Sequence, residues 1–245
     1  MEVHAHTHTP RKKWTHYFWE FLMLFLAVFC GFLAENLREH KIERDREKQF
    51  VSSLVQDLAE DTITLKSESN LNKANVERLD SFLHLLCLES VKGYEGELYY
   101  LARKASRGDV LALNDRTIQQ MKNSGAFRLI RKENVSKAII EYYNRLSFYD
   151  LLLKVEQGET EEYRKQVAGI FHPEVMDRLI NKKDEILKPA DNPPLLTYDT
   201  TTLLRLAGMV SYLKNTRLGT ARVEMEMYDA AKKLIELLKK EYHLK

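Results

Sequence analysis

The sequence has few of the residues that break helices or cross-link chains. Its 245 residues include 9 glycines and 5 prolines, which argues against a turn-rich β fold and favours long helices. The two cysteines, Cys30 and Cys87, supply no disulfide framework and do not decide a redox compartment. The formal net charge is only +2, so we expect no binding to nucleic acid.

Recognisable catalytic motifs are also missing. The chain contains no P-loop, no G-x-G-x-x-G, no H-E-x-x-H and no G-x-S-x-G. Because the members of a nucleophile–base pair can lie far apart in a sequence, these absences lower the expectation of an enzyme without removing it. We therefore expect no cofactor and favour a non-enzymatic function.

The most informative feature that is present is an apolar stretch near the N-terminus. Residues 21–34 read FLMLFLAVFCGFLA and carry no charge. Extended back to Trp14, the stretch would form a helix about 31 Å long, close to the thickness of a bilayer core. Aromatic residues gather at its start and basic residues lie just before it, as at a membrane interface. We predict a transmembrane helix over residues 14–34.

Two alternatives and the orientation of this helix have to be weighed. A cleaved signal peptide requires small residues before the cut, but Phe32 stands where one is needed. A core helix of a soluble protein is amphipathic, whereas this stretch is apolar all round. Basic residues lie on both sides of the span. Arg11, Lys12 and Lys13 abut the span and favour an N-terminus inside the cytoplasm. The basic residues after the span count for less, because long domains translocate largely regardless of their charge. We therefore expect the N-terminus inside and the following domain outside the cytoplasm.

The rest of the chain divides by composition. Residues 1–13 form a basic, histidine-rich tail. Residues 35–49, ENLREHKIERDREKQ, are almost wholly charged and read as a solvated helical stalk. Residues 50–245 show amphipathic helical periodicity, with no strand-like alternation between turn residues. The polar segment 66–75, KSESNLNKAN, is expected to kink or to lie exposed.

The predicted fold class is all-α. We expect one transmembrane helix, a charged helical stalk and an antiparallel helical bundle of about four main helices with some short ones. Asp115 is a candidate N-cap, and either Asp199 or Thr200 can cap the last helix. Gly125 is a candidate C-terminal stop that would send Phe127, Leu129 and Ile130 into the core. Gly219 either breaks the last helix or lies within it.

Three histidines of the tail are the only candidate metal ligands. His4, His6 and His8 alternate in HAHTHT, and imidazoles bind Zn, Ni or Cu. No ordered partner is visible in the sequence, and a tail loses conformational entropy when it binds. The metal site is a prediction that rests on these side chains alone.

One ionisable residue lies within the apolar stretch. Glu20 is about one helical turn past the Trp14 end, where a charge is costly and is by default a sign of function. It can pair with His16, four residues earlier on the same helical face. A contact between helices in an oligomer, or a carboxylate that reaches water at the interface, are the alternatives.

Other polar and aromatic groupings favour structural interpretations. Asp57, Glu60 and Asp61 read as a solvated acidic face. Tyr142, Tyr143 and Tyr149 follow an apolar stripe and are expected in the core. His84 and Cys87, one turn apart among leucines, are expected to serve packing.

Several short motifs give the chain a family resemblance. They are DLAED (57–61), TIQQMKNSGAFRLI (117–130), AIIEYY (138–143) and YLKNTRLG (212–219), in that order after the anchor and stalk. In these the chain resembles a family of uncharacterised bacterial single-span membrane proteins with a helical domain after the anchor. The resemblance implies the same architecture and a bacterial inner membrane. It implies no activity and no catalytic residues.

These observations favour a membrane-anchored helical interaction or sensory module without enzymatic activity. Its partners would be the lipid bilayer through residues 14–34, and a protein partner or further copies of the chain. The alternative is a small-ligand or metal-binding helical bundle that uses a pocket between helices. A cryptic hydrolase is the third hypothesis, and it would require a cluster of titratable residues in one cleft.

Overall fold

The computed structural model describes residues 14–107 and 112–244. Every regular element in these residues is a helix, apart from one isolated bridge between Ile180 and Ile186. The all-α prediction is therefore confirmed. The chain divides into two compact units, Met1–Phe50 and Val51–Lys245.

The described part of the first unit belongs to a single helix, α1 (Trp14–Leu86), which also supplies the first helix of the second unit. An 18-residue window of α1 has a mean hydropathy of 2.0, and none of it is buried within the molecule. Phe21, Phe25 and Phe29 stack on successive turns, with ring centroids 6.2 and 5.9 Å apart. Among the described residues, α1 is the one helix that is long and apolar enough to cross a membrane.

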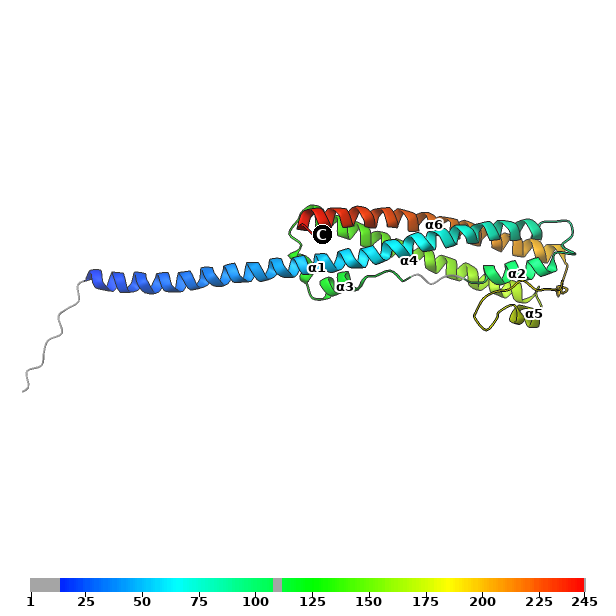
Figure 1. Ribbon diagram of the computed structural model, residues 1–245, viewed down its shortest axis with the longest axis horizontal. Helices are drawn as coiled ribbons and strands as arrows, with labels where there is room; N and C mark the ends of the chain where they lie inside the picture. The colour runs from blue at the N-terminus through cyan, green and yellow to red at the C-terminus, as the bar shows by residue number, and fades with distance from the viewer. Residues whose placement is uncertain (1–13, 108–111, 245) are drawn as a thin grey trace, which may run out of the picture. The chain divides into compact units, whose positions relative to one another are not determined.

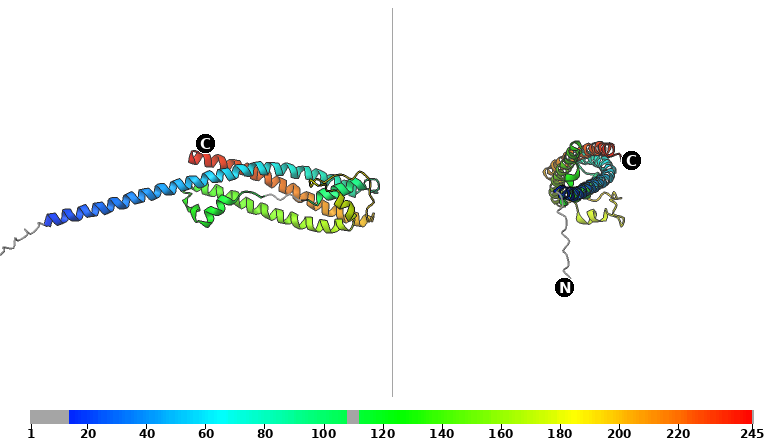
Figure 2. Two further views of the ribbon diagram at one scale, coloured as in Figure 1. Left: turned by 60° about the horizontal axis from the view of Figure 1, so that its bottom comes forward. Right: turned by 90° about the vertical axis from the view of Figure 1, so that its left-hand side faces the viewer.

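The second unit is built on three long helices that lie side by side (Figures 1 and 2): α1 from residue 51, α4 (Glu133–Ala168) and α6 (Thr200–Tyr242). Lys132 at the start of α4 bonds to Glu241 at the end of α6, so these two helices are antiparallel. In Figure 1 the colours advance in the same direction along α1 and α4 and in the opposite direction along α6. Thus α6 runs against both other helices.

The helix α1 runs without interruption through residues 66–75, and the expected exposure of this segment holds for only some of its residues. Two polar residues of this segment, Ser69 and Asn72, are buried, with exposed fractions of 0% and 9%. Ser69 Oγ donates to the carbonyl of Ala221 on α6, 3.0 Å away. Buried hydrogen bonds replace apolar contacts here, so the helix keeps its inward face despite its polar sequence. This continuity leaves three long helices where about four were predicted.

Four short helices are the remaining regular elements among the described residues of the second unit. They are α2 (Glu95–Ala105), α3 (Arg116–Asn123), a 3-10 helix η1 (Ala126–Leu129) and α5 (Pro173–Arg178). Figure 1 places α2 and α5 at the end of the unit where α4 ends and α6 begins. An apolar core forms there from α1, α2, α4, α5 and α6. Its fully buried side chains include Phe82, Leu98, Tyr99, Tyr163, Ile170, Leu206, Val210 and Leu213.

Most of the predicted helix boundaries are observed. The side chain of Asp199 accepts a 2.8 Å hydrogen bond from the Thr202 backbone, which confirms it as the N-cap of α6. The residue after α3, Ser124, is followed by Gly125 with a φ of 68°, a conformation that favours glycine. Gly219 lies within α6. Of the three residues expected to enter the core after Gly125, only Ile130 is buried.

Candidate functional site

Polar side chains occupy core positions in the middle of α6. The apolar stripe of this helix runs to Leu213 and resumes at Met227, and Arg217, Thr220 and Glu224 fill the positions between them at the same spacing. All three are only 1% exposed. The sequence analysis missed them, although the signal was present, since polar residues at four- and three-residue steps continue an inward-facing stripe.

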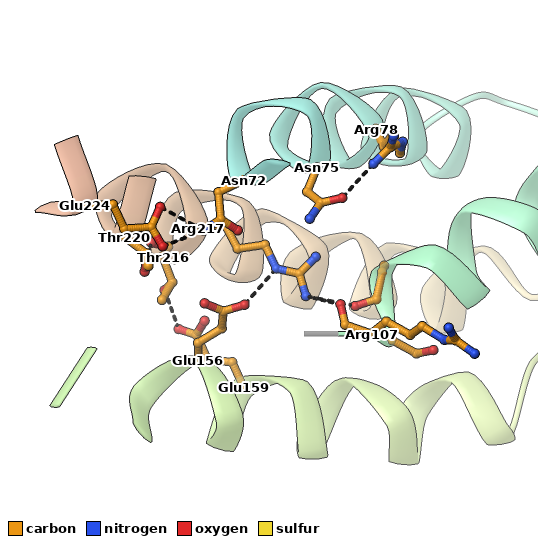
Figure 3. Close-up of polar contacts among 12 residues, drawn as sticks. Asn72, Asn75, Arg78, Arg107, Glu156, Glu159, Thr216, Arg217, Thr220 and Glu224 are labelled. Atoms are coloured by element: carbon orange, nitrogen blue, oxygen red, sulfur yellow. Dashed lines mark hydrogen bonds and ion pairs between the residues drawn. The ribbon is translucent and has the colours of Figure 1, made fainter. Parts of the chain in front are cut away.

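Arg217 is the largest of these buried groups. Figure 3 shows its guanidinium extending toward Glu156 on α4 and toward the end of α2. Its Nε donates to Glu156 Oε1 at 2.9 Å, and its Nη2 donates to the carbonyls of Ala105 and Arg107 at 3.1 and 3.0 Å. Because a buried cation is stable only when paired and hydrogen-bonded, Arg217 ties α6, α4 and the C-terminus of α2 together.

Glu224 lies two turns further along α6. Asn72 Nδ2 on α1 donates to both of its carboxylate oxygens, at 3.0 and 3.1 Å, and the Tyr149 hydroxyl on α4 donates to Oε1 at 2.9 Å. Burial raises the pKa of Glu224 to about 7, against the lowering effect of the bonds from Asn72 and Tyr149, and the nearby Glu68 and Glu156 raise it further. Thus all three long helices meet at a carboxyl group that takes up a proton near neutral pH.

The solvated acidic face expected on α1 is wrong for two of its three carboxylates, since only Glu60 is exposed. Asp57 and Asp61 are 5% and 1% exposed. Asp57 accepts from the Thr117 backbone at 3.2 Å, and Asp61 accepts from the Asn114 backbone at 2.8 Å. Burial raises the pKa of Asp61, partly offset by the bonds from Asn114. The two carboxylates satisfy backbone N–H groups at the start of α3, a tertiary use that no local pattern announces.

A third polar centre fastens the loop before α6 onto α2. Glu95 accepts from the Tyr198 hydroxyl at 3.0 Å, from the Gly93 backbone at 2.8 Å and from the Asn192 side chain. Burial raises the pKa of Glu95, but its hydrogen bonds outweigh that effect and hold the pKa below its usual value. Gly96 donates to Asn192 Oδ1 at 2.6 Å. The segment 188–194 is therefore a docked loop of the second unit.

The polar groups around Arg217 and Glu224 are bonded to partners within the second unit. The hydroxyl groups of Ser69 and Tyr149 donate to a carbonyl and to Glu224, and burial raises the Tyr149 pKa far above its usual value. Across residues 14–107 and 112–244, no three histidine, cysteine, aspartate or glutamate side chains are placed to hold a metal ion. At the contacts between helices, the cluster contains a carboxyl that binds a proton, Glu224, and an arginine paired with a carboxylate, Arg217.

The structure locates the remaining predicted residues individually. His16 Nε2 lies 3.1 Å from Glu20 Oε1, so these two side chains pair as the spacing predicted. Tyr142, Tyr143 and Tyr149 are buried, which confirms them as core aromatics. His84 and Cys87 are exposed, so the expectation that they serve packing is wrong. His4, His6 and His8 lie outside the described residues, and their metal site stays a prediction.

Comparisons with protein-family models, with curated proteins and with solved structures found no match for this chain.

Proposed function

We propose that the chain is a single-span membrane protein whose second unit is a non-enzymatic interaction or sensory module, arranged as a helical bundle in which α6 is antiparallel to α1 and α4. One observation carries this proposal: the helix α1 includes both an entirely unburied apolar segment and the buried residues Ser69 and Asn72. A ligand or partner that repacks the helices would therefore act on the same helix that enters the bilayer.

The membrane part of the proposal follows from exposed surface. Phe21, Leu24 and Phe32 expose 64%, 70% and 68% of their area, and most of the other large apolar residues between them are exposed too. A continuous apolar surface of this kind is not stable in water, whereas a bilayer core covers it. The location proposed from the resemblance is a bacterial inner membrane.

Substitution in the middle of the span tests integration. On insertion scales an arginine at the centre of a membrane helix costs about 2.5 to 3.5 kcal/mol. We expect the double variant Leu24→Arg/Leu26→Arg to be extracted from membranes by alkaline carbonate, and the unaltered chain to stay. Leu37→Arg, in the charged stalk, is the control and should also stay. Equal retention of the unaltered chain and the double variant would show that residues 14–34 do not span.

Reporter fusions test the orientation. Alkaline phosphatase and a fluorescent protein are fused separately after Lys245 and compared in a bacterial host. The proposed topology predicts phosphatase activity without fluorescence, because phosphatase matures only outside the cytoplasm. Fluorescence without phosphatase activity would place the second unit inside and reverse the orientation.

The interaction part is supported by an apolar patch on the second unit. Phe148, Leu151 and Val155 lie on one face of α4, at steps of three and four residues, and are 54%, 58% and 52% exposed. Tyr212 on α6 is 68% exposed and lines the same shallow pocket as Val155. Contiguous exposed apolar side chains of this extent commonly mark contact surfaces.

Site-specific photocross-linking tests this surface. A benzophenone amino acid replaces Leu151 in the patch or Glu161, an exposed position on the same helix. In bacterial membranes that contain the chain we expect a discrete cross-linked product from position 151 and none from position 161. Mass spectrometry of that product identifies either a partner protein or a second copy of the chain. No product at either position, together with a monomeric chain, would contradict an interaction module.

A further inference from the structure

A pocket of about 410 Å³ opens among α2, α4 and α5, on the second unit and apart from the apolar patch. Its volume lies within the range of small-molecule sites. The apolar part of its lining includes Val167, Phe171 and Met176, which are 6%, 1% and 9% exposed. The Phe171 ring packs edge-on against Tyr99 with centroids 5.0 Å apart, so this wall is fixed by the core.

Arg103 brings a hydrogen-bond donor without an acceptor to this pocket. It lies in the last turn of α2, and its Nε is buried without a hydrogen-bond acceptor among the described residues. The contrast with Arg217 is informative, because that guanidinium is bonded to a carboxylate and to two carbonyls. A buried donor without an acceptor destabilises the folded protein, and a ligand can supply the acceptor that Arg103 lacks.

A second guanidinium lies in the same lining and is held in place. Arg164 on α4 donates from Nε and Nη2 to the carbonyl of Ser106, at 3.0 and 2.6 Å. This bond satisfies a carbonyl at the C-terminus of α2 and fixes the orientation of the guanidinium. The pocket therefore contains two arginine side chains, one anchored and one with an unused donor.

The charges around the pocket select the valence of the anion. Asp177 is the one carboxylate in the lining, and it is exposed on α5. Asp184, close enough to Arg103 for that cation to lower its pKa, is already bonded to Arg107 at 2.6 Å. Two guanidinium groups and one carboxylate leave a single positive charge, which suits a monoanion and disfavours a doubly charged phosphate monoester.

We propose that this pocket binds a small monocarboxylate with an apolar body. The carboxylate accepts hydrogen bonds from Arg103, whose planar fork matches its geometry, and the apolar body rests on Val167, Phe171 and Met176. This site is independent of the proposed membrane topology and of the apolar patch on α4.

Calorimetry on the full chain in lipid nanodiscs tests the proposal, with phenylacetate as the probe and empty nanodiscs subtracted. Phenylacetamide, which has the same shape without the charge, is the matched ligand control. We expect phenylacetate to bind at least about tenfold more tightly than phenylacetamide. Arg103→Gln should weaken phenylacetate binding by about tenfold or more, which corresponds to about 1.4 kcal/mol.

Two further variants separate binding from folding. Lys104→Gln removes the neighbouring charge of α2 outside the pocket lining and should leave binding unchanged. Ala168→Phe places a ring at an exposed position of the lining and should block binding while the circular dichroism spectrum is preserved.

Three results would overturn the proposal. They are equal binding of phenylacetate and phenylacetamide, unchanged binding in Arg103→Gln, or no heat from the unaltered chain up to about 10 mM probe. If Arg103→Gln does not fold, the comparison of the two ligands and the Ala168→Phe variant decide the matter.

Discussion

The protonation of Glu224 should make the stability of the second unit depend on pH. Its pKa rises from 4.5 to about 7 because the carboxyl is buried where α1, α4 and α6 meet. A pKa that moves from 4.5 to about 7 corresponds to about 3 kcal/mol of free energy. The folded protein binds the proton more tightly than the unfolded chain does. The contribution of Glu224 to the free energy of unfolding is therefore fully present below pH 4.5, and this contribution is lost as the pH rises through about 7.

The substitution Glu224→Gln isolates this contribution. Glutamine resembles the protonated carboxyl, and its carbonyl can still accept from Asn72 and Tyr149. We expect the variant to be more stable than the unaltered chain by up to about 3 kcal/mol at about pH 8.5, and nearly equal to it at about pH 5. The pKa of Asp61 is also raised by burial, but its contribution is common to both proteins and cancels in the difference.

Urea denaturation followed by circular dichroism measures the difference, with both proteins in the same mild detergent at several pH values. The control is Glu226→Gln, at an exposed position two residues further along α6, which should not alter the pH profile. A stability difference between Glu224→Gln and the unaltered chain that stays constant from about pH 5 to about pH 8.5 would refute the reasoning.

Four further substitutions test the packing of the second unit by the same denaturation assay. Arg217→Met should cost about 3 to 5 kcal/mol, because it leaves Glu156, whose side chain is only 12% exposed, without its cation. Gly96→Ala should destabilise by about 1 to 3 kcal/mol, because the new Cβ would lie 2.9 Å from the backbone carbonyl oxygen of Asp191. Gly208→Ala should stabilise by about 0.5 to 1 kcal/mol, because a Cβ at that point of α6 meets open space. Phe82→Ala should cost about 3 to 5 kcal/mol through the cavity it leaves.

Each of these expectations has a control or a result that contradicts it. Replacing Glu156 with leucine in the Arg217→Met background should restore part of the loss, because no unpaired charge then remains. Destabilisation by Gly208→Ala as large as that by Gly96→Ala would show that backbone crowding is not the cause. Ile63→Ala, at a 74% exposed position of α1, should change stability by less than about 0.5 kcal/mol, and a loss equal to that of Phe82→Ala would contradict the core assignment.

Local sequence patterns predicted what depends on neighbouring residues. The cap at Asp199 and the left-handed glycine at position 125 both follow from backbone chemistry within one turn. The His16–Glu20 contact likewise follows from the four-residue spacing on one helix face.

The candidate site depended on partners far away in the sequence. Asp57 and Asp61 read as a solvated face, whereas in the folded chain the start of α3 brings backbone donors to them. Arg217 occupies a core position because Glu156 and two carbonyls of α2 and its C-terminal end surround it. A buried charge is stable only with such partners, and a helical period alone does not reveal whether they exist.

The sequence by itself determined the all-α class, the apolar helix near the N-terminus and the positions of several helix ends, because these depend on composition and on interactions within a turn or two. Only the tertiary structure decided that residues 66–75 remain helical, that Glu224 is buried beside Asn72 and Tyr149, and that Arg103 faces a pocket. The physical reason is that the cost of burying a polar group is set by the hydrogen bonds it finds across helices, and these connect residues more than 70 positions apart.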